Sequence, residues 1–128
     1  MDNIQFELHD IQRFPRVIFL NHLTYEGYAS QWIAEMDSLL HRQEKFVIIF
    51  PDGGENENRE DRKLRGIWLK ENKPQMQRLC AGLVVIEPQE SQRKRLEQQA
   101  AAATQSFGVS YYFAADQQAA ETLASSLI

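Results

Sequence analysis

The sequence predicts an α/β domain built on a mixed β-sheet, and three observations support this. Short β-branched and aromatic runs alternate with longer stretches that have helical spacing. Residues 45–50 and 80–88 are apolar through their centres, as strands covered on both faces are. The 128 residues, 43% hydrophobic and 25% charged, have the composition of a globular chain. We therefore expect a single domain over residues 1–128, with a core that needs no disulfide or structural metal.

The N-terminal part predicts two strands. In "IQFELHDI", residues 4–11, apolar and polar side chains alternate as in a half-exposed strand. "RVIFLNHL", residues 16–23, follows Pro15 and is rich in β-branched and aromatic side chains. Because the two runs are close in sequence, we expect them to pair as an antiparallel hairpin.

A first helix is predicted over residues 25–43. Thr24 is placed to cap it, with Glu26 in the first turn, where the helix dipole favours an anion. Its apolar side chains recur at steps of three and four residues, so this helix should face the core. They are Ala29, Ile33, Met36 and Leu40, with Trp32 and Leu39 widening the stripe.

The strands at 45–50 and 80–88 flank a second predicted helix over residues 59–72. Its expected buried face consists of Leu64, Ile67, Trp68 and Leu69. Pro74 should end or kink this helix, because proline disfavours the helical conformation of the residue before it. A strand, helix and strand in this order predict neighbouring parallel strands with a right-handed connection.

The C-terminal third predicts a helix, a strand and a helix. The helix over residues 90–107 carries a narrow stripe of Leu96, Ala100, Ala103 and Phe107, and Gly108 should end it. A strand follows at residues 109–115, and Asp116 is placed to cap a last helix that buries Ala120, Leu123 and Leu127. The predicted order is β-β-α-β-α-β-α-β-α, a four- to five-stranded sheet with about four helices, antiparallel only at its start.

Three segments resemble the SpoIIAA-like fold of STAS domains, in particular the small stand-alone bacterial proteins of the STAS/SEC14 type. They are "LTYEGYASQW" at 23–32, "FVIIFPD" at 46–52, and the ending "QSFGVSYYFAADQQAAETLASSL" at 105–127. The ending is similar to the family's closing unit, in which a short aromatic strand leads into an amphipathic helix. The resemblance implies a SpoIIAA-like domain that acts by binding a partner or a ligand.

The same resemblance raises the question of a phosphorylation switch. Anti-sigma-factor antagonists of this family carry a phosphorylatable Ser or Thr just after the strand that corresponds to residues 45–50, where phosphate charge switches an interface. This chain has no Ser or Thr between Leu39 and Glu90. We therefore expect no switch of that kind here.

Charge and composition narrow the partners. The net charge of −4 argues against binding nucleic acid or an anionic membrane. No apolar run approaches the roughly 20 residues that span a bilayer, and the first residues lack the pattern of a secretory signal, so a cytoplasmic protein is expected. The single cysteine, Cys80, is interpreted as a core residue.

Residues for acid-base chemistry are few. His22 lies near Tyr25 and Tyr28 at a strand-to-helix junction, while Asp52 and Glu55 follow the strand at 45–50. An acid-base site would be built from His22, Asp52 and Glu55. The histidines lack metal-ligand spacing, and basic residues interleave with the acids after Phe50, so we expect no metal and no cofactor.

Two functions are therefore left open. One is a non-catalytic binding or regulatory module that docks a protein partner or a small apolar ligand, and the other is a small α/β enzyme using the strand-end loops. For binding, the candidate residues are Tyr25, Tyr28, Trp32, Asp52, Gly53, Gly54 and Trp68. The two tryptophans are either core residues or flank a shared groove, which would suit an apolar ligand or a homodimer.

Overall fold

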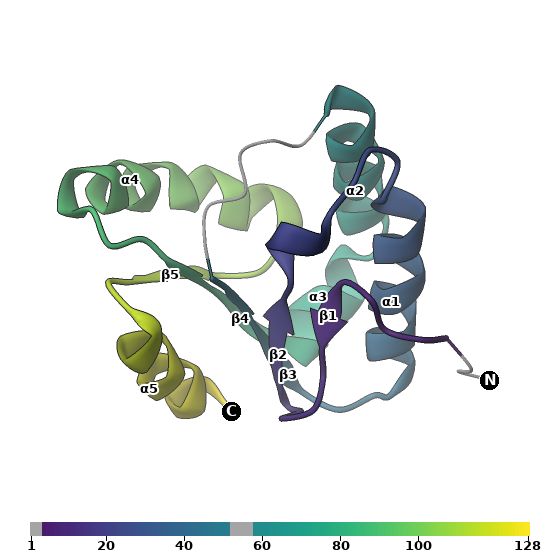
Figure 1. Ribbon diagram of the computed structural model, residues 1–128, viewed down its shortest axis with the longest axis horizontal. Helices are drawn as coiled ribbons and strands as arrows, with labels where there is room; N and C mark the ends of the chain where they lie inside the picture. The colour runs from purple at the N-terminus through teal and green to yellow at the C-terminus, as the bar shows by residue number, and fades with distance from the viewer. Residues whose placement is uncertain (1–3, 52–57) are drawn as a thin grey trace.

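The computed structural model describes residues 4–51 and 58–128, which form a five-stranded sheet between helices (Figure 1). The strands lie in chain order and are β1 (His9–Asp10), β2 (Arg16–Phe19), β3 (Phe46–Phe50), β4 (Cys80–Ile86) and β5 (Tyr111–Ala114). β1 pairs antiparallel with β2, and all later pairs are parallel. The mixed sheet, its antiparallel start and the parallel pairing of β3 with β4 confirm the predicted α/β fold class.

Five α-helices and one short 3-10 helix lie among the described residues. They are η1 (Asn21–Leu23), α1 (Ala29–His41), α2 (Arg59–Glu71), α3 (Lys73–Leu79), α4 (Glu90–Phe107) and α5 (Gln117–Leu127). The count exceeds the expected four because the helical stretch breaks at Asn72, and α3 begins there with Pro74 in its first turn. Proline is tolerated in a first turn, where its missing N–H has no partner to lose.

Side chains that alternate along each strand divide the core into two layers. On β3, Phe46 and Ile48 face the layer that α1, α2 and α3 cover, while Val47 and Ile49 face α5. Figure 1 shows α5 alone on its side of the sheet, with α1 to α4 on the other. The last of these, α4, lies along β4 and the edge strand β5.

The first predicted strand is wrong over most of its length, because only His9–Asp10 pairs with β2. The backbone N–H groups of Glu7 and Leu8 instead donate to the carboxylate of Glu35 on α1, at 2.8 and 3.0 Å. His9, expected on the exposed face, is buried beside the same carboxylate. The backbone N–H groups of residues 7 and 8 therefore bond to a side chain distant in sequence and not to the neighbouring strand.

The predicted cap of the first helix is also wrong. α1 begins at Ala29, and the Thr24 hydroxyl donates to the carbonyl of Asn21 instead. Asp61 of α2 takes over the capping role, since its carboxylate accepts hydrogen bonds from the backbone N–H groups of Gly27 and Ala29 at 2.9 and 3.1 Å. The first turn of α1 is thus stabilised by a residue 32 positions along the chain.

The buried face of α2 is narrower than predicted. Trp68 and Leu69 are buried, but Leu64 and Ile67 are 37% and 44% exposed. α2 turns Trp68 toward α1, and this orientation leaves the other two side chains at the surface.

The two caps predicted in the C-terminal third, one at the end of α4 and one at the start of α5, are confirmed. Gly108 ends α4 with φ of 79°, a left-handed conformation that favours glycine. It also approaches α3 closely, since a Cβ there would lie 2.5 Å from Cγ of Gln77. Asp116 caps α5 by accepting from the N–H of Ala119.

Candidate functional site

α4 packs on the sheet, but none of its 18 residues is fully buried. Leu96, Ala100 and Ala103 face β4 and β5 and are half-buried. The stripe that the sequence predicted is therefore present, and two of its four residues, Ala100 and Ala103, are alanines. The short side chains of these alanines leave space between α4 and the sheet.

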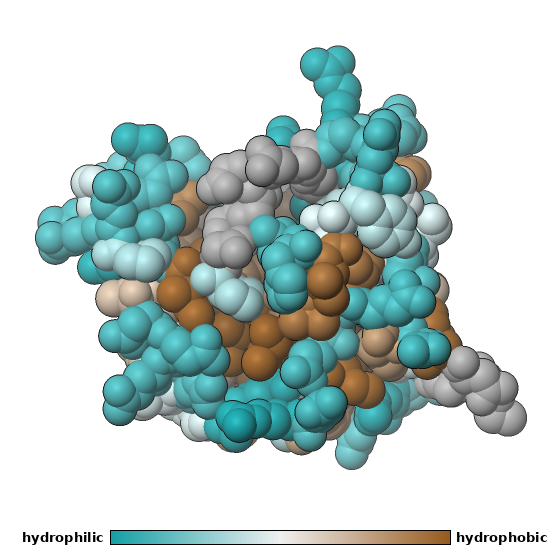
Figure 2. All heavy atoms as spheres, in the orientation of Figure 1, coloured by the Kyte–Doolittle hydropathy of each residue, from teal (hydrophilic) through white to brown (hydrophobic). Residues whose placement is uncertain are grey.

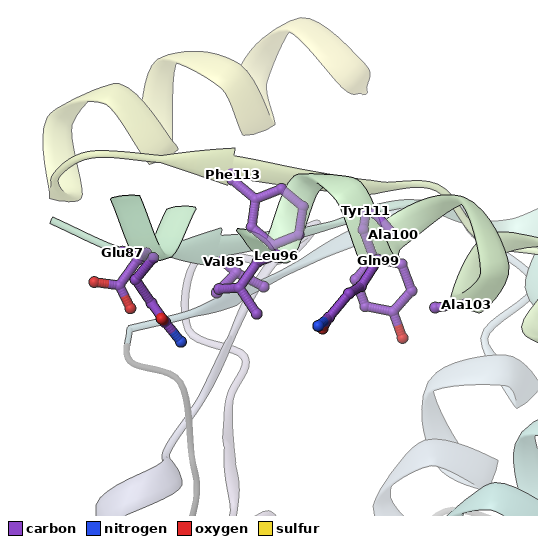
Figure 3. A pocket seen from close by; sticks show the side chains of 9 residues that line it. Val85, Glu87, Leu96, Gln99, Ala100, Ala103, Tyr111 and Phe113 are labelled. Atoms are coloured by element: carbon purple, nitrogen blue, oxygen red, sulfur yellow. The ribbon is translucent and has the colours of Figure 1, made fainter. Parts of the chain in front are cut away.

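A cavity of about 300 Å³ occupies this space. Figure 3 shows the side chains that line it, from the sheet on one side and from α4 on the other. Its lining consists of Val85, Glu87, Gln92, Leu96, Gln99, Ala100, Ala103, Tyr111 and Phe113. The volume is at the lower end of the range for small-molecule sites, which are mostly apolar and carry a few polar groups. We call this cavity the α4 pocket.

The parallel register of β4 and β5 sets the floor of the α4 pocket. Val85 lies beside Phe113, and Leu83 lies beside Tyr111. Glu87 follows directly after β4, and its backbone N–H donates to the carbonyl of Ala114 at 2.8 Å. The pocket therefore reaches the carboxyl ends of two parallel strands, the edge at which ligands usually bind in open α/β sheets.

Tyr111 supplies a phenol to the pocket. Burial raises the pKa of this phenol above its ordinary value, and the positive charge of Arg65 on α2 offsets part of the effect. The hydroxyl therefore stays protonated at neutral pH and can donate a hydrogen bond. The other polar groups in the lining are the amides of Gln92 and Gln99 and the carboxylate of Glu87.

Figure 2 shows that apolar residues gather on one face of the molecule. They lie near the middle of the sheet, between the polar outer surface of α4 and that of α1 and α2. Phe50, at the end of β3, is only half-buried and packs against the first core layer.

Trp32 and Trp68 lie side by side but do not flank a groove. Each is 5% exposed, and their rings meet edge to face with centroids 5.3 Å apart. The indole N–H of Trp68 donates to Asp37 at 2.8 Å, and the guanidinium of Arg65 lies 5.4 Å from the Trp32 ring. The structure thus corrects the groove hypothesis, because the indoles fill the contact between α1 and α2.

The other predicted site residues that the structure describes differ in their burial. His22 lies on η1 and Tyr25 lies after it, and both are exposed. Tyr28 is buried in the first core layer. Asp52, Gly53, Gly54 and Glu55 lie outside the described residues. None of the described members of this set lines the α4 pocket.

Sequence reasoning missed a buried, hydrogen-bonded cluster around Glu35. This carboxylate is 0% exposed and contacts His9 Nδ1 at 2.7 Å, and it also accepts from Gln31 Nε2 at 2.6 Å. Burial alone would raise the pKa of Glu35, but these bonds and those from the Glu7 and Leu8 backbone favour the charged form and hold its pKa below the ordinary value. A charged residue in the apolar stripe of the first helix was the available signal.

The Glu35 cluster is structural in character. An ionised carboxylate only accepts hydrogen bonds, so the Nδ1 of His9 carries the proton in their contact. The His9 ring also packs against Phe19, with centroids 5.3 Å apart. The cluster fixes the N-terminal segment to α1, and it does not line the α4 pocket.

Within residues 4–51 and 58–128, no group of three or more His, Cys, Asp or Glu side chains is arranged to hold a metal ion. The same residues contain no helix that is both long and apolar enough to cross a membrane. The cysteine among them, Cys80, is buried, and burial raises its pKa to about 12, so it stays a neutral thiol.

No protein-family model, curated protein or solved structure matches this chain. A function for this chain is therefore inferred from the site itself.

Proposed function

We propose that this protein is a non-catalytic binding module that holds a small apolar ligand in the α4 pocket. The observation that carries the proposal is the cavity of about 300 Å³ under a helix with no buried residue. Its walls combine aliphatic and aromatic side chains with a few polar groups at the carboxyl ends of β4 and β5. A ligand in this space would supply the contacts that the alanine stripe of α4 cannot make.

The available volume suggests the size of the ligand. An apolar protein cavity of about 150 Å³ accommodates benzene, which has six carbon atoms. By proportion, a cavity of about 300 Å³ accommodates a ligand of about twelve non-hydrogen atoms.

The fold supports a more specific family proposal. A sheet whose strands follow chain order, antiparallel only at its first pair, agrees with the SpoIIAA-like fold that the sequence resembles. We propose that the chain is a cytoplasmic, stand-alone member of that group. Its role would be to bind a ligand, because the stretch after β3 has no Ser or Thr to phosphorylate.

A protein partner, including a second copy of the chain, is the second candidate. The exposure of Leu64 and Ile67 on α2 favours it, because exposed apolar side chains that are close together mark many interfaces. Sedimentation of the unmodified chain and of a Leu64→Gln, Ile67→Gln variant over a range of concentrations tests self-association. If the unmodified chain is a monomer at every concentration, the homodimer proposal is wrong.

Naphthalene, with ten carbon atoms and no polar group, is the first ligand to test. We expect saturable shifts of the backbone amide signals of Val85, Leu96 and Phe113 in ¹H–¹⁵N spectra. Shifts confined to other regions, or no saturable shift, would refute the α4 pocket as a ligand site.

Two alanines of α4 provide a matched pair of variants. Ala100 lines the pocket, whereas Ala101 is exposed on the outer face of the same helix. Ala100→Leu should fill the cavity and weaken naphthalene binding by about tenfold or more. Ala101→Leu adds the same side chain outside the pocket and should leave binding unchanged. Equal effects of the two variants would contradict the proposed site.

A further inference from the structure

This inference rests on the proposed function and concerns the chemical class of the ligand. The charges around the α4 pocket are unevenly distributed. Among its nine lining residues, Glu87 alone carries a formal charge. Figure 3 places Glu87 at one end of the pocket, with the ring of Tyr111 toward the other and apolar side chains between them.

The backbone of Glu87 is held in a fixed position, because its N–H is bonded to the carbonyl of Ala114 on β5. One carboxylate oxygen, Oε2, accepts from the N–H of Gln89 at 3.0 Å. A carboxylate has about four acceptor positions, so this bond leaves capacity for further donors. The end of the pocket is therefore equipped to receive a hydrogen-bond donor.

Arg93, one turn into α4, is a basic side chain with bonds to this turn. Its guanidinium donates to the backbone carbonyl of Glu87 at 2.9 Å and lies 3.5 Å from that of Pro88. Arg93 does not line the pocket. The exposed Glu90 and Lys94 lie 3.8 Å apart on the same helix and offset each other. Among the described residues that line the pocket, the charge at this end is thus that of Glu87.

The sheet register gives the length of the pocket. Tyr111 pairs with Leu83, and Glu87 lies four residues further along the chain from Leu83. At about 3.3 Å per residue, the two ends of the pocket are separated by about 13 Å along the strand direction. An elongated ligand fits this separation better than a compact one.

We propose that the ligand of the α4 pocket is an elongated amphiphile whose head donates hydrogen bonds to Glu87, with an alkylammonium head preferred, and whose apolar body lies against Val85, Leu96 and Phe113. An anionic head is disfavoured at this end because it would face the Glu87 carboxylate and offer it no proton. The head group decides which amphiphile binds best, because the apolar walls contact an apolar chain of similar length in every case.

Three probes with ten-carbon chains separate the head group from the body. At pH 7 decylamine is cationic, 1-decanol is neutral and decanoate is anionic. Titration calorimetry below micelle-forming concentrations should give affinities in the order decylamine, 1-decanol, decanoate. We expect about a fivefold step between the first two, as for a partly exposed ion pair. Ala100→Leu should weaken all three, which distinguishes the pocket from general attraction to an acidic protein.

Two glutamates provide the decisive comparison. Glu87→Gln should abolish the preference for decylamine over 1-decanol. Glu90→Gln removes the same charge from a side chain that does not line the pocket and should leave the preference intact. A preference that persists in Glu87→Gln, or decanoate as the tightest probe, would overturn the head-group inference while naphthalene binding still supported the site. Failure of naphthalene to bind in the pocket would overturn the proposed function itself.

Discussion

Replacing Glu35 tests whether the buried carboxylate organises the N-terminal segment. In Glu35→Ala the backbone N–H groups of Glu7 and Leu8 and the Nδ1 of His9 lose their acceptor, and of these three residues Leu8 and His9 are buried. Leaving a buried donor without its acceptor typically costs about 1–3 kcal/mol, so the two buried donors together should cost about 2–6 kcal/mol. We expect a loss of this size in the free energy of unfolding.

Urea unfolding followed by circular dichroism measures this loss, with Glu44→Ala as the control, because Glu44 is exposed just after α1. Surface substitutions of this kind usually change stability by no more than about 0.5 kcal/mol. A loss below about 1 kcal/mol for Glu35→Ala would refute the reasoning, since it would mean that water or other groups replace the carboxylate without cost.

The pH dependence provides an independent check on the same residue. The folded protein holds the pKa of Glu35 below its ordinary value of 4.5. A carboxyl group whose pKa is lowered by folding stabilises the protein fully above its unfolded pKa, and this contribution is lost as the pH falls through the folded pKa. Stability should therefore fall on acidification below about pH 4.5. Glu35→Gln should lack this part of the pH dependence, and an unchanged acid profile in that variant would contradict the lowered pKa.

Three further predictions concern single residues away from the pocket, each measured as the change in the free energy of unfolding in urea. Asp61→Ala should destabilise by about 1–2 kcal/mol through loss of the α1 cap. The neighbouring Glu60 is exposed, so Glu60→Ala should change stability little, and equal effects of the two variants would contradict the capping role. Gly108→Ala should destabilise by more than about 1 kcal/mol because Gly108 has a positive φ and packs closely against α3. Gly66→Ala, in the interior of α2 with open space around it, should stabilise by about 0.5–1 kcal/mol. The opposite signs would refute this reasoning. Trp68→Phe should cost about 1–3 kcal/mol through the lost indole hydrogen bond and poorer packing, and a neutral result would show that this bond contributes nothing.

The α4 pocket could be predicted from the sequence only in part. The narrow stripe on residues 90–107 was evident, and so were the bounds of the helix, because its spacing and Gly108 depend on local conformation. That a stripe rich in alanine would leave a cavity depends on how far α4 stands from β4 and β5. This distance is set by how the side chains of the three elements pack together, on which local patterns carry no information.

The amino-acid sequence by itself determined the class of the fold, the mixed sheet, the parallel inner strands and most of the helix ends. These follow from periodicity and from the conformational limits of glycine and proline, which act over a few neighbouring residues. Tertiary structure alone decided the partners of Glu35, the capping of α1 by Asp61 and the edge-to-face packing of Trp32 and Trp68. In each case a polar or aromatic group is satisfied by a residue about 25 to 40 positions away, because folding pairs buried polar groups wherever the topology brings them together.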